Sequence, residues 1–214
     1  MKQKFVETLK VPEGAACTYE DGVLVCKQGD VELKKTLDYP HMQVAIKGNE
    51  VTLTCPAGNK RHYAYVNTYR KHVQNMFLGL KEPFVYSLEI AHVHFPMTVK
   101  VDGDKVSVTN FLGEKTPRFA KILPGVQVEI KENIITVTSN DKEAAGQTAA
   151  NLERATRLKG RDRRIFQDGI YITEKSDRKV SELDPVEEEV TAPEKEEGPK
   201  AEIEVEAKEE KKDG

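Results

Sequence analysis

Hydrophobic and polar residues alternate in two segments of the chain that resemble each other. Residues 43–55 read QVAIKGNEVTLTC and residues 127–139 read QVEIKENIITVTS, with seven of 13 positions identical. In both segments apolar side chains occupy every second position around a short turn, which is typical of a β-hairpin with one buried face. A repeat of this length predicts a duplicated domain, because solenoid units are much shorter.

A helical pattern follows the first hairpin. Residues 60–78 predict an amphipathic helix, with Gly79 as its expected stop. Such a helix buries one stripe against a core and exposes the other face to solvent. The apolar positions of this stripe are Val66, Tyr69, Val73, Met76, Phe77 and Leu80.

The second hairpin is also followed by a helical pattern. Residues 142–158 predict a helix that begins with a capping box formed by Asn140 and Glu143 and ends at Gly160. The face expected to pack on the core comprises Ala145, Ala149, Leu152 and Ala155. Both repeats therefore predict the same order of elements, a hairpin and then a helix.

Shorter alternating runs precede each hairpin. Residues 23–25 and 31–33 come before the first hairpin. Residues 97–101 and 106–109 come before the second and are joined at Asp102-Gly103, a dipeptide typical of tight hairpin turns. Each repeat thus has enough strands for a small antiparallel sheet.

These elements predict an α+β protein made of two duplicated lobes, each a small antiparallel β-sheet packed on one helix. The expected first lobe spans residues 1–83 and the second spans residues 84–173. After Pro83 the chain again alternates, which predicts an extended connection between the lobes through Phe84, Tyr86, Leu88 and Ile90.

Charge divides the chain unevenly. The 214 residues carry a net charge of −3, but residues 174–214 contain 16 acidic and 8 basic side chains, which leaves 20 acidic and 25 basic in residues 1–173. The acidic segment has no aromatic residue and few large apolar ones, so it predicts a disordered tail. The remaining body is mildly basic, which suits a polyanionic partner.

The sequence offers little support for an enzyme. It has no GxSxG motif, no Walker A loop and no GxGxxG motif, and we expect no catalytic residue, cofactor or small-molecule substrate. His92 and His94 would share a face of a strand, but a metal site needs a third ligand and none stands out nearby. Cys17, Cys26 and Cys55 lack CxxC spacing and are expected to be reduced thiols. No signal peptide or membrane-spanning run is present in the sequence, which predicts an intracellular protein.

The clearest candidate for chemistry is a basic stretch. Residues 159–172 read KGRDRRIFQDGIYI and follow directly on the second predicted helix. Arginine predominates, and its planar guanidinium suits bidentate phosphate contacts. A solvated charged face is the simpler alternative. The expected RNA-binding set is Lys115, Arg118, Arg154, Arg157, Lys159, Arg161, Arg163 and Arg164, with Phe166 and Tyr171 either stacking on RNA or packing in the core.

Four motifs in this order resemble one known family. They are FPMTVKV (95–101), NFLGEKTPR (110–118), GQTAANLERAT (146–156) and the basic stretch. Together they closely resemble the archaeal–eukaryotic branch of the ribosomal protein L6 family of the large ribosomal subunit. The resemblance covers about residues 1–173, including the duplication, and its motifs in the second lobe are long and specific.

The resemblance implies a structural, non-enzymatic protein of the cytoplasmic ribosome. The family has two homologous α+β lobes and binds 23S-type ribosomal RNA mainly through the second, near the sarcin–ricin loop and the base of the factor-binding stalk. By this resemblance residues 159–171 form the loop that touches RNA, Lys115 and Arg118 belong to a second basic loop, and neighbouring ribosomal proteins are partners. Gly146 and the alanines of its motif would allow close packing.

One alternative and one departure remain. A protein-interaction scaffold would use the duplicated lobes and the acidic tail to contact proteins, with the arginines solvated or paired. The acidic tail is not part of the family pattern. Because RNA repels it, we expect the tail to project into solvent or to meet a basic partner protein.

Overall fold

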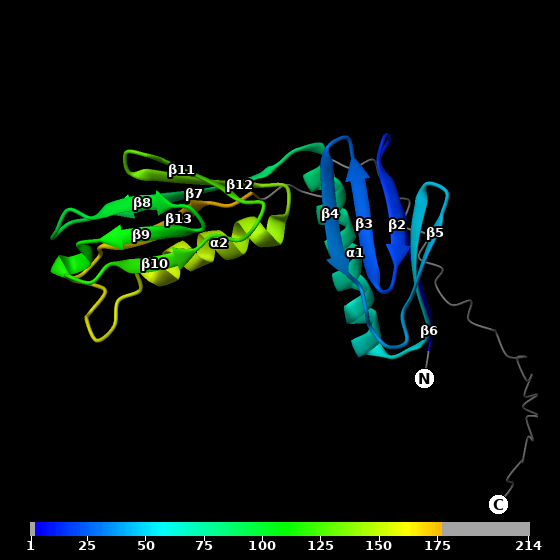
Figure 1. The fold of residues 1–214 in the computed structure, drawn as a ribbon. Coiled ribbons are helices and arrows are strands. Elements are labelled where there is room, and N and C mark those ends of the chain that lie inside the picture. Colours follow the sequence, from blue (N-terminus) through cyan, green and yellow to red (C-terminus); the bar gives the residue numbers. More distant parts are fainter. Residues whose placement is uncertain (1–2, 177–214) are drawn as a thin grey trace, which may run out of the picture.

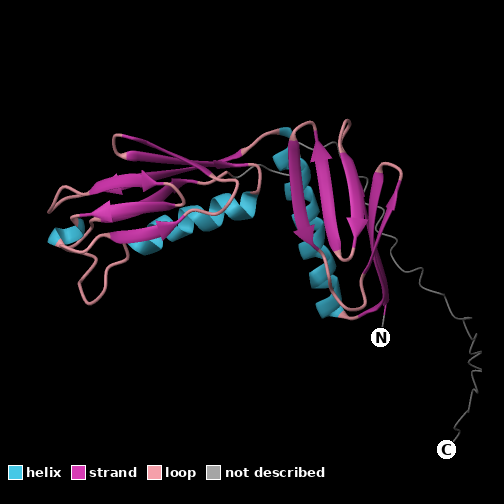
Figure 2. Cartoon of the chain, in the orientation of Figure 1, coloured by secondary structure: helices cyan, strands magenta, loops and turns pink. Residues whose placement is uncertain are grey.

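A computed structural model of the chain describes residues 3–176, and Figure 1 shows them as two lobes joined by a short connection. The predicted disordered tail lies outside the described residues, apart from residues 174–176. The α+β class is confirmed, since small antiparallel sheets and one long helix make up each lobe (Figure 2).

The first lobe contains two three-stranded antiparallel sheets, in the orders β1-β6-β5 and β2-β3-β4, with α1 packed against them. The predicted hairpin forms as β5 and β6, and the buried positions of β6 are alternate residues, as the pattern requires. The elements are β1 (Gln3–Lys10), β2 (Ala16–Glu20), β3 (Val23–Gln28), β4 (Val31–Thr36), β5 (Gln43–Lys47), β6 (Glu50–Gly58) and α1 (Lys60–Lys81).

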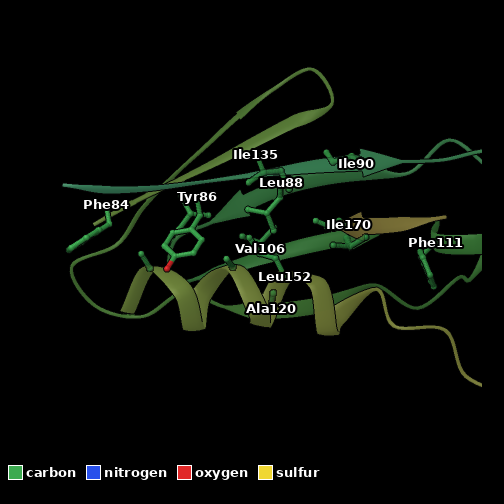
Figure 3. Close-up of a cluster of buried hydrophobic side chains, with 14 of the residues drawn as sticks. Phe84, Tyr86, Leu88, Ile90, Val106, Phe111, Ala120, Ile135, Leu152 and Ile170 are labelled. Atoms are coloured by element: carbon green, nitrogen blue, oxygen red, sulfur yellow. The ribbon is translucent and has the colours of Figure 1, made fainter. Parts of the chain in front are cut away.

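The second lobe contains a four-stranded sheet, β11-β12-β7-β13, and a three-stranded sheet, β10-β9-β8. Its core lies between these sheets and α2, where Leu88, Ile135, Leu152 and Ile170 are at most 1% exposed (Figure 3). The elements are β7 (Phe84–Ala91), β8 (Thr98–Asp102), β9 (Lys105–Thr109), the 3-10 turn η1 (Phe111–Gly113), β10 (Arg118–Lys121), β11 (Gln127–Lys131), β12 (Ile134–Ser139), α2 (Lys142–Ala155) and β13 (Gly169–Glu174).

The segment expected to connect the lobes is a central strand of the second lobe. β7 pairs with β12 on one side and with β13 on the other. Its alternating apolar residues therefore face the core of the second lobe. The last residues of the basic stretch, 169–172, form the first part of β13, and α2 ends a few residues before the stretch begins, so the stretch is held at both ends by regular structure.

Helix α1 passes through its predicted stop. Gly79 is buried inside the helix, which continues to Lys81 and is capped by the extended residue Glu82, whose N–H donates to the carbonyl of Leu78. Pro83 follows, and a residue before proline disfavours helical backbone angles. Gly79 is at this position because the chain packs closely there: a Cβ would lie 2.0 Å from the carbonyl oxygen of Asn140.

Helix α2 is shorter than predicted at its C-terminal end, and its N-cap lies one residue later. Asp141, not Asn140, caps the helix by accepting from the N–H of Glu143 at 2.9 Å. The helix ends at Ala155, so the positive-φ Gly160 (φ 69°) belongs to the following loop. The first turn of α2 also contacts the first lobe, because Glu143 forms ion pairs with Lys35 of β4 and His72 of α1.

Neither helix within residues 3–176 is both long enough and apolar enough to cross a membrane.

Candidate nucleic-acid interface

Residues 159–168 of the basic stretch lie in the loop between α2 and β13. This basic loop, residues 156–168, lies at the end of the second lobe farthest from the first lobe (Figure 1). Arg154 is in the last turn of α2, where a cation complements the negative end of the helix dipole. The exposed cations of this region are Arg154, Arg157, Lys159, Arg161, Arg163 and Arg164.

Hydrogen bonds to its own backbone give the basic loop a defined shape. At its start the buried Thr156 hydroxyl accepts from the N–H of Ile170 on β13 at 2.9 Å and donates to the Glu153 carbonyl at 3.2 Å. Further along, the Asp162 carboxylate accepts from the N–H of Arg164 at 2.9 Å, which forms an Asx turn. Asp162 is the one acidic residue of the basic loop besides Asp168, and its carboxylate is therefore hydrogen-bonded to the backbone.

The cations of this region form no salt bridge with an acidic side chain of the described chain, although the charge of Arg161 helps to lower the pKa of Glu114. Across residues 3–176 the salt bridges within 4.0 Å involve other side chains, and none includes the six cations from Arg154 to Arg164. Unpaired positive charges on one loop repel each other, and an external polyanion relieves that repulsion. The arrangement suits phosphate groups.

Three of these arginines surround a shallow hollow. The hollow has a volume of about 270 Å³ and is lined by Arg154, Arg157 and Arg163 together with Tyr171 of β13. The Tyr171 ring is 43% exposed, and its hydroxyl donates to the Gln167 carbonyl at 3.1 Å. Tyr171 is thus outside the core, beside three arginines and the acidic Glu153, which also lines the hollow.

Phe166 has a different environment from Tyr171. It is half-buried, its ring centroid lies 5.0 Å from that of His94, and the guanidinium carbon of Arg161 lies 4.8 Å from the ring centroid. Its faces are therefore in contact with other side chains of the protein. These contacts favour a packing role, with Arg161 held over the ring by a cation–π interaction.

The two cations of the second predicted loop, residues 113–118, differ as well. Lys115 is exposed and forms no salt bridge within the described chain. Arg118 is engaged on all sides: it binds Glu114 at 2.6 and 2.8 Å, donates to the carbonyls of Ala155 and Arg157 at 3.0 and 3.1 Å, and stacks 4.3 Å from the Phe111 centroid. The hydrogen bonds from Arg118 lower the pKa of Glu114. Arg118 therefore fastens the end of α2 to this loop.

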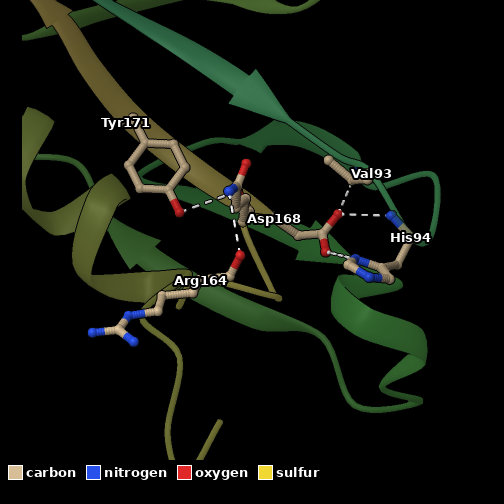
Figure 4. Close-up of polar contacts among 6 residues, drawn as sticks. Val93, His94, Arg164, Asp168 and Tyr171 are labelled. Atoms are coloured by element: carbon tan, nitrogen blue, oxygen red, sulfur yellow. Dashed lines mark hydrogen bonds and ion pairs between the residues drawn. The ribbon is translucent and has the colours of Figure 1, made fainter. Parts of the chain in front are cut away.

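Sequence reasoning did not identify Asp168 and His94 as a pair. Asp168 is 2% exposed, and its carboxylate accepts from the N–H groups of Val93 and His94, the latter at 3.0 Å, and lies 2.6 Å from His94 Nδ1 (Figure 4). His92 and His94 also do not lie on a strand, since β7 ends at Ala91 and the chain then bends.

The pKa of Asp168 reflects two opposing causes. Burial raises the pKa, but the hydrogen bonds from His94 and Val93 outweigh burial and lower it overall. A carboxyl with a lower pKa in the folded chain stabilises the fold above its unfolded pKa, near 3.9, and this stabilisation is lost as pH falls through the folded pKa.

Asp168→Asn is expected to lower the free energy of unfolding by about 2 kcal/mol at pH 7, because an amide replaces a buried carboxylate that accepts several hydrogen bonds. The difference from the unmodified chain should begin to shrink below about pH 4, where the unfolded chain takes up the proton, and should be lost as pH falls through the lower pKa of Asp168 in the folded chain. Urea denaturation between pH 3 and 7 measures both effects. Asp102→Asn at an exposed position is the control, and a difference that stays constant with pH would contradict this account.

Cys17, Cys26 and Cys55 are free cysteines. Cys17 and Cys26 lie opposite each other on β2 and β3, with their sulfur atoms 2.7 Å apart, and this contact lowers the pKa of Cys17. Residues 3–176 contain no group of three or more His, Cys, Asp or Glu side chains placed to hold a metal ion.

Comparison with known proteins gives a consistent family. Residues 95–169 match the family model described as "Ribosomal protein L6". The chain is 43% identical over 170 residues to "Large ribosomal subunit protein uL6" of Methanococcus vannielii, covering 79% of this chain and 93% of that protein. It is 40% identical over 170 residues to the protein of the same name from Methanospirillum hungatei JF-1, covering 79% and 97%.

Proposed function

The chain belongs to the ribosomal protein L6 family, and we propose that its second lobe binds 23S-type ribosomal RNA near the sarcin–ricin loop and the base of the factor-binding stalk. The chain is a structural component of the large ribosomal subunit in the cytoplasm and is not an enzyme. The family predicted from the four sequence motifs is confirmed.

One observation carries the RNA-binding part of this proposal. Six exposed cations, from Arg154 to Arg164, occupy a single loop and the helix turn before it, and none forms a salt bridge among residues 3–176. Phosphates of a folded RNA are the natural counterions for such a loop. The hydrogen bonds of Thr156 and Asp162 hold the loop in shape, so less entropy is lost when it binds.

The proposed contact residues divide by their surroundings. The six cations from Arg154 to Arg164 and Lys115 neutralise phosphates. The exposed ring of Tyr171 lies beside Arg154, Arg157 and Arg163. Arg118 and Phe166, which are engaged within the protein, hold the loop in position. Phosphate contacts supply affinity, and the folded shape of the RNA supplies specificity.

The domain organisation and the remaining partners are part of the same proposal. The lobes are assigned to residues 1–83 and 84–173, and residues 174–214 form the acidic tail. Neighbouring large-subunit proteins, including those at the stalk base, are proposed to contact the chain. A basic neighbour is the natural partner of a segment with 16 acidic and 8 basic residues.

Two measurements test this function. In a sucrose gradient of a cell lysate, the protein is expected to travel with the large subunit and to stay there through a moderate salt wash. The purified chain is expected to bind a large-subunit rRNA transcript that carries the sarcin–ricin loop and stalk-base helices. With about six phosphate contacts, a log–log plot of affinity against salt should have a slope of about −4 to −5. Free protein at the top of the gradient, with partner binding that does not depend on salt, would favour an interaction scaffold instead.

A further inference from the structure

His94 lies beside the basic loop but is not among the residues that charge alone points to. It follows β7, and its ring packs 5.0 Å from the Phe166 ring, which in turn carries Arg161. Its side chain remains 33% exposed. His94 is therefore at the surface of the proposed RNA interface, and its side chain is partly exposed to solvent.

The hydrogen bonds of Asp168 determine which ring nitrogen of His94 carries the proton. Asp168 Oδ1 already accepts from the N–H groups of Val93 and His94, and Oδ2 lies 2.6 Å from His94 Nδ1 (Figure 4). An ionised carboxylate only accepts hydrogen bonds, so Nδ1 must donate. In the neutral imidazole the other nitrogen, Nε2, is then an acceptor, and no hydrogen bond to Nε2 is found within residues 3–176.

An acceptor is unusual at an interface for a polyanion. The cations of the basic loop are donors that suit phosphate oxygens, whereas the Nε2 lone pair would repel phosphate oxygens. The donor that every ribonucleotide presents is the ribose 2′-hydroxyl, which also distinguishes RNA from DNA. The buried carboxylate therefore gives His94 a role complementary to that of the arginines of the basic loop.

We infer that His94 is an additional RNA-contacting residue, whose Nε2 accepts a hydrogen bond from a ribose 2′-hydroxyl of the bound RNA. This inference rests on the proposed function, because it needs RNA at the basic loop. It gives the loop a second mode of recognition: arginines contact phosphates on any nucleic acid, while His94 responds to the ribose.

The test combines a variant with an atomic change in the RNA. A pool of the rRNA transcript carries one randomly placed 2′-deoxynucleotide per molecule, and the molecules that the protein binds are separated from those that it leaves unbound. The fraction bound by the unmodified chain should contain few molecules whose deoxynucleotide lies at the position that His94 contacts. His94→Ala should bind the all-ribose RNA about tenfold more weakly, as expected for one lost hydrogen bond, and should no longer exclude that molecule. His92→Ala, an exposed histidine two residues away, is the control and should leave both results unchanged.

The outcomes separate this inference from the function on which it rests. If the unmodified chain does not bind the transcript, the proposed function fails, and the His94 contact fails with it. If the unmodified chain binds but His94→Ala shows the same pattern of 2′-deoxy exclusion, RNA binding stands and the His94 contact is overturned. A merely structural role for His94 predicts that second result, because misplacing the loop would weaken binding to every member of the pool equally.

Discussion

Replacing Arg161, Arg163 and Arg164 together with alanine is expected to weaken binding to large-subunit rRNA about 100- to 1000-fold at moderate salt. All three are exposed, and none forms a salt bridge within the described chain, so their charges can be neutralised by phosphates. Each lost phosphate contact also removes a counterion-release step. The slope of log affinity against log salt should therefore fall in magnitude by about 2 to 3. A salt titration of binding by filter retention or fluorescence anisotropy measures both quantities.

The control for this variant removes the same charge elsewhere on the second lobe. Lys100, Lys105 and Lys131 are exposed lysines on β8, β9 and β11, and their replacement by alanine should change affinity less than fivefold. Circular dichroism should show that both variants remain folded, because none of the six side chains packs in the core. Unchanged affinity and an unchanged slope in the arginine variant would mean that the basic loop does not contact RNA.

Local patterns explain why much of the fold could be predicted from the sequence. The alternation in residues 43–55 and 127–139 is enforced by burial of one face of each hairpin, and both hairpins form where expected. The same holds for the helix faces, where Ala145, Ala149 and Leu152 are buried. The α+β class depends on these patterns alone.

What local patterns missed depends on contacts between distant segments. β7 has the alternation of any half-buried strand, and only its neighbours β12 and β13 show that it belongs to the centre of a sheet. The carboxylate of Asp168 meets Val93 and His94, 74 to 75 residues earlier in the chain. The residues next to Asp168 in the sequence give no indication of this contact.

The candidate interface shows the same division. Charge density was enough to identify the loop that carries Arg161, Arg163 and Arg164. It did not distinguish Arg118, whose guanidinium binds Glu114 and two carbonyls near the end of α2, from the exposed Lys115 three residues earlier. Composition reports which charges a segment has, whereas partners elsewhere in the fold decide which of them remain free.

Gly79→Ala is expected to lower the free energy of unfolding by about 2–3 kcal/mol, although alanine is the better helix former. Inside an unconstrained helix the substitution would stabilise by about 1 kcal/mol. Here the new Cβ would lie 2.0 Å from the carbonyl oxygen of Asn140 and 3.0 Å from a ring carbon of Phe84. The first of these atoms is backbone and cannot move without displacing Asp141, the N-cap of α2. Overlap of this kind in a packed region costs more than the propensity gains.

The Gly79→Ala substitution is also expected to disturb the contacts between the two lobes. Displacing the start of α2 also moves Glu143, which binds Lys35 and His72 of the first lobe. Urea denaturation followed by circular dichroism measures the loss, and Gly146→Ala is the matched control. In that variant the Cβ would meet the Tyr86 side chain, with the hydroxyl at 3.3 Å and the nearest ring carbon at 3.6 Å. A small shift of that side chain relieves the contact, so the free energy of unfolding should change by no more than about 1 kcal/mol. If Gly79→Ala were as stable as the unmodified chain, α1 and the α2 N-terminus could not be packed as closely as the structure shows, and the lobes would be free to change their angle.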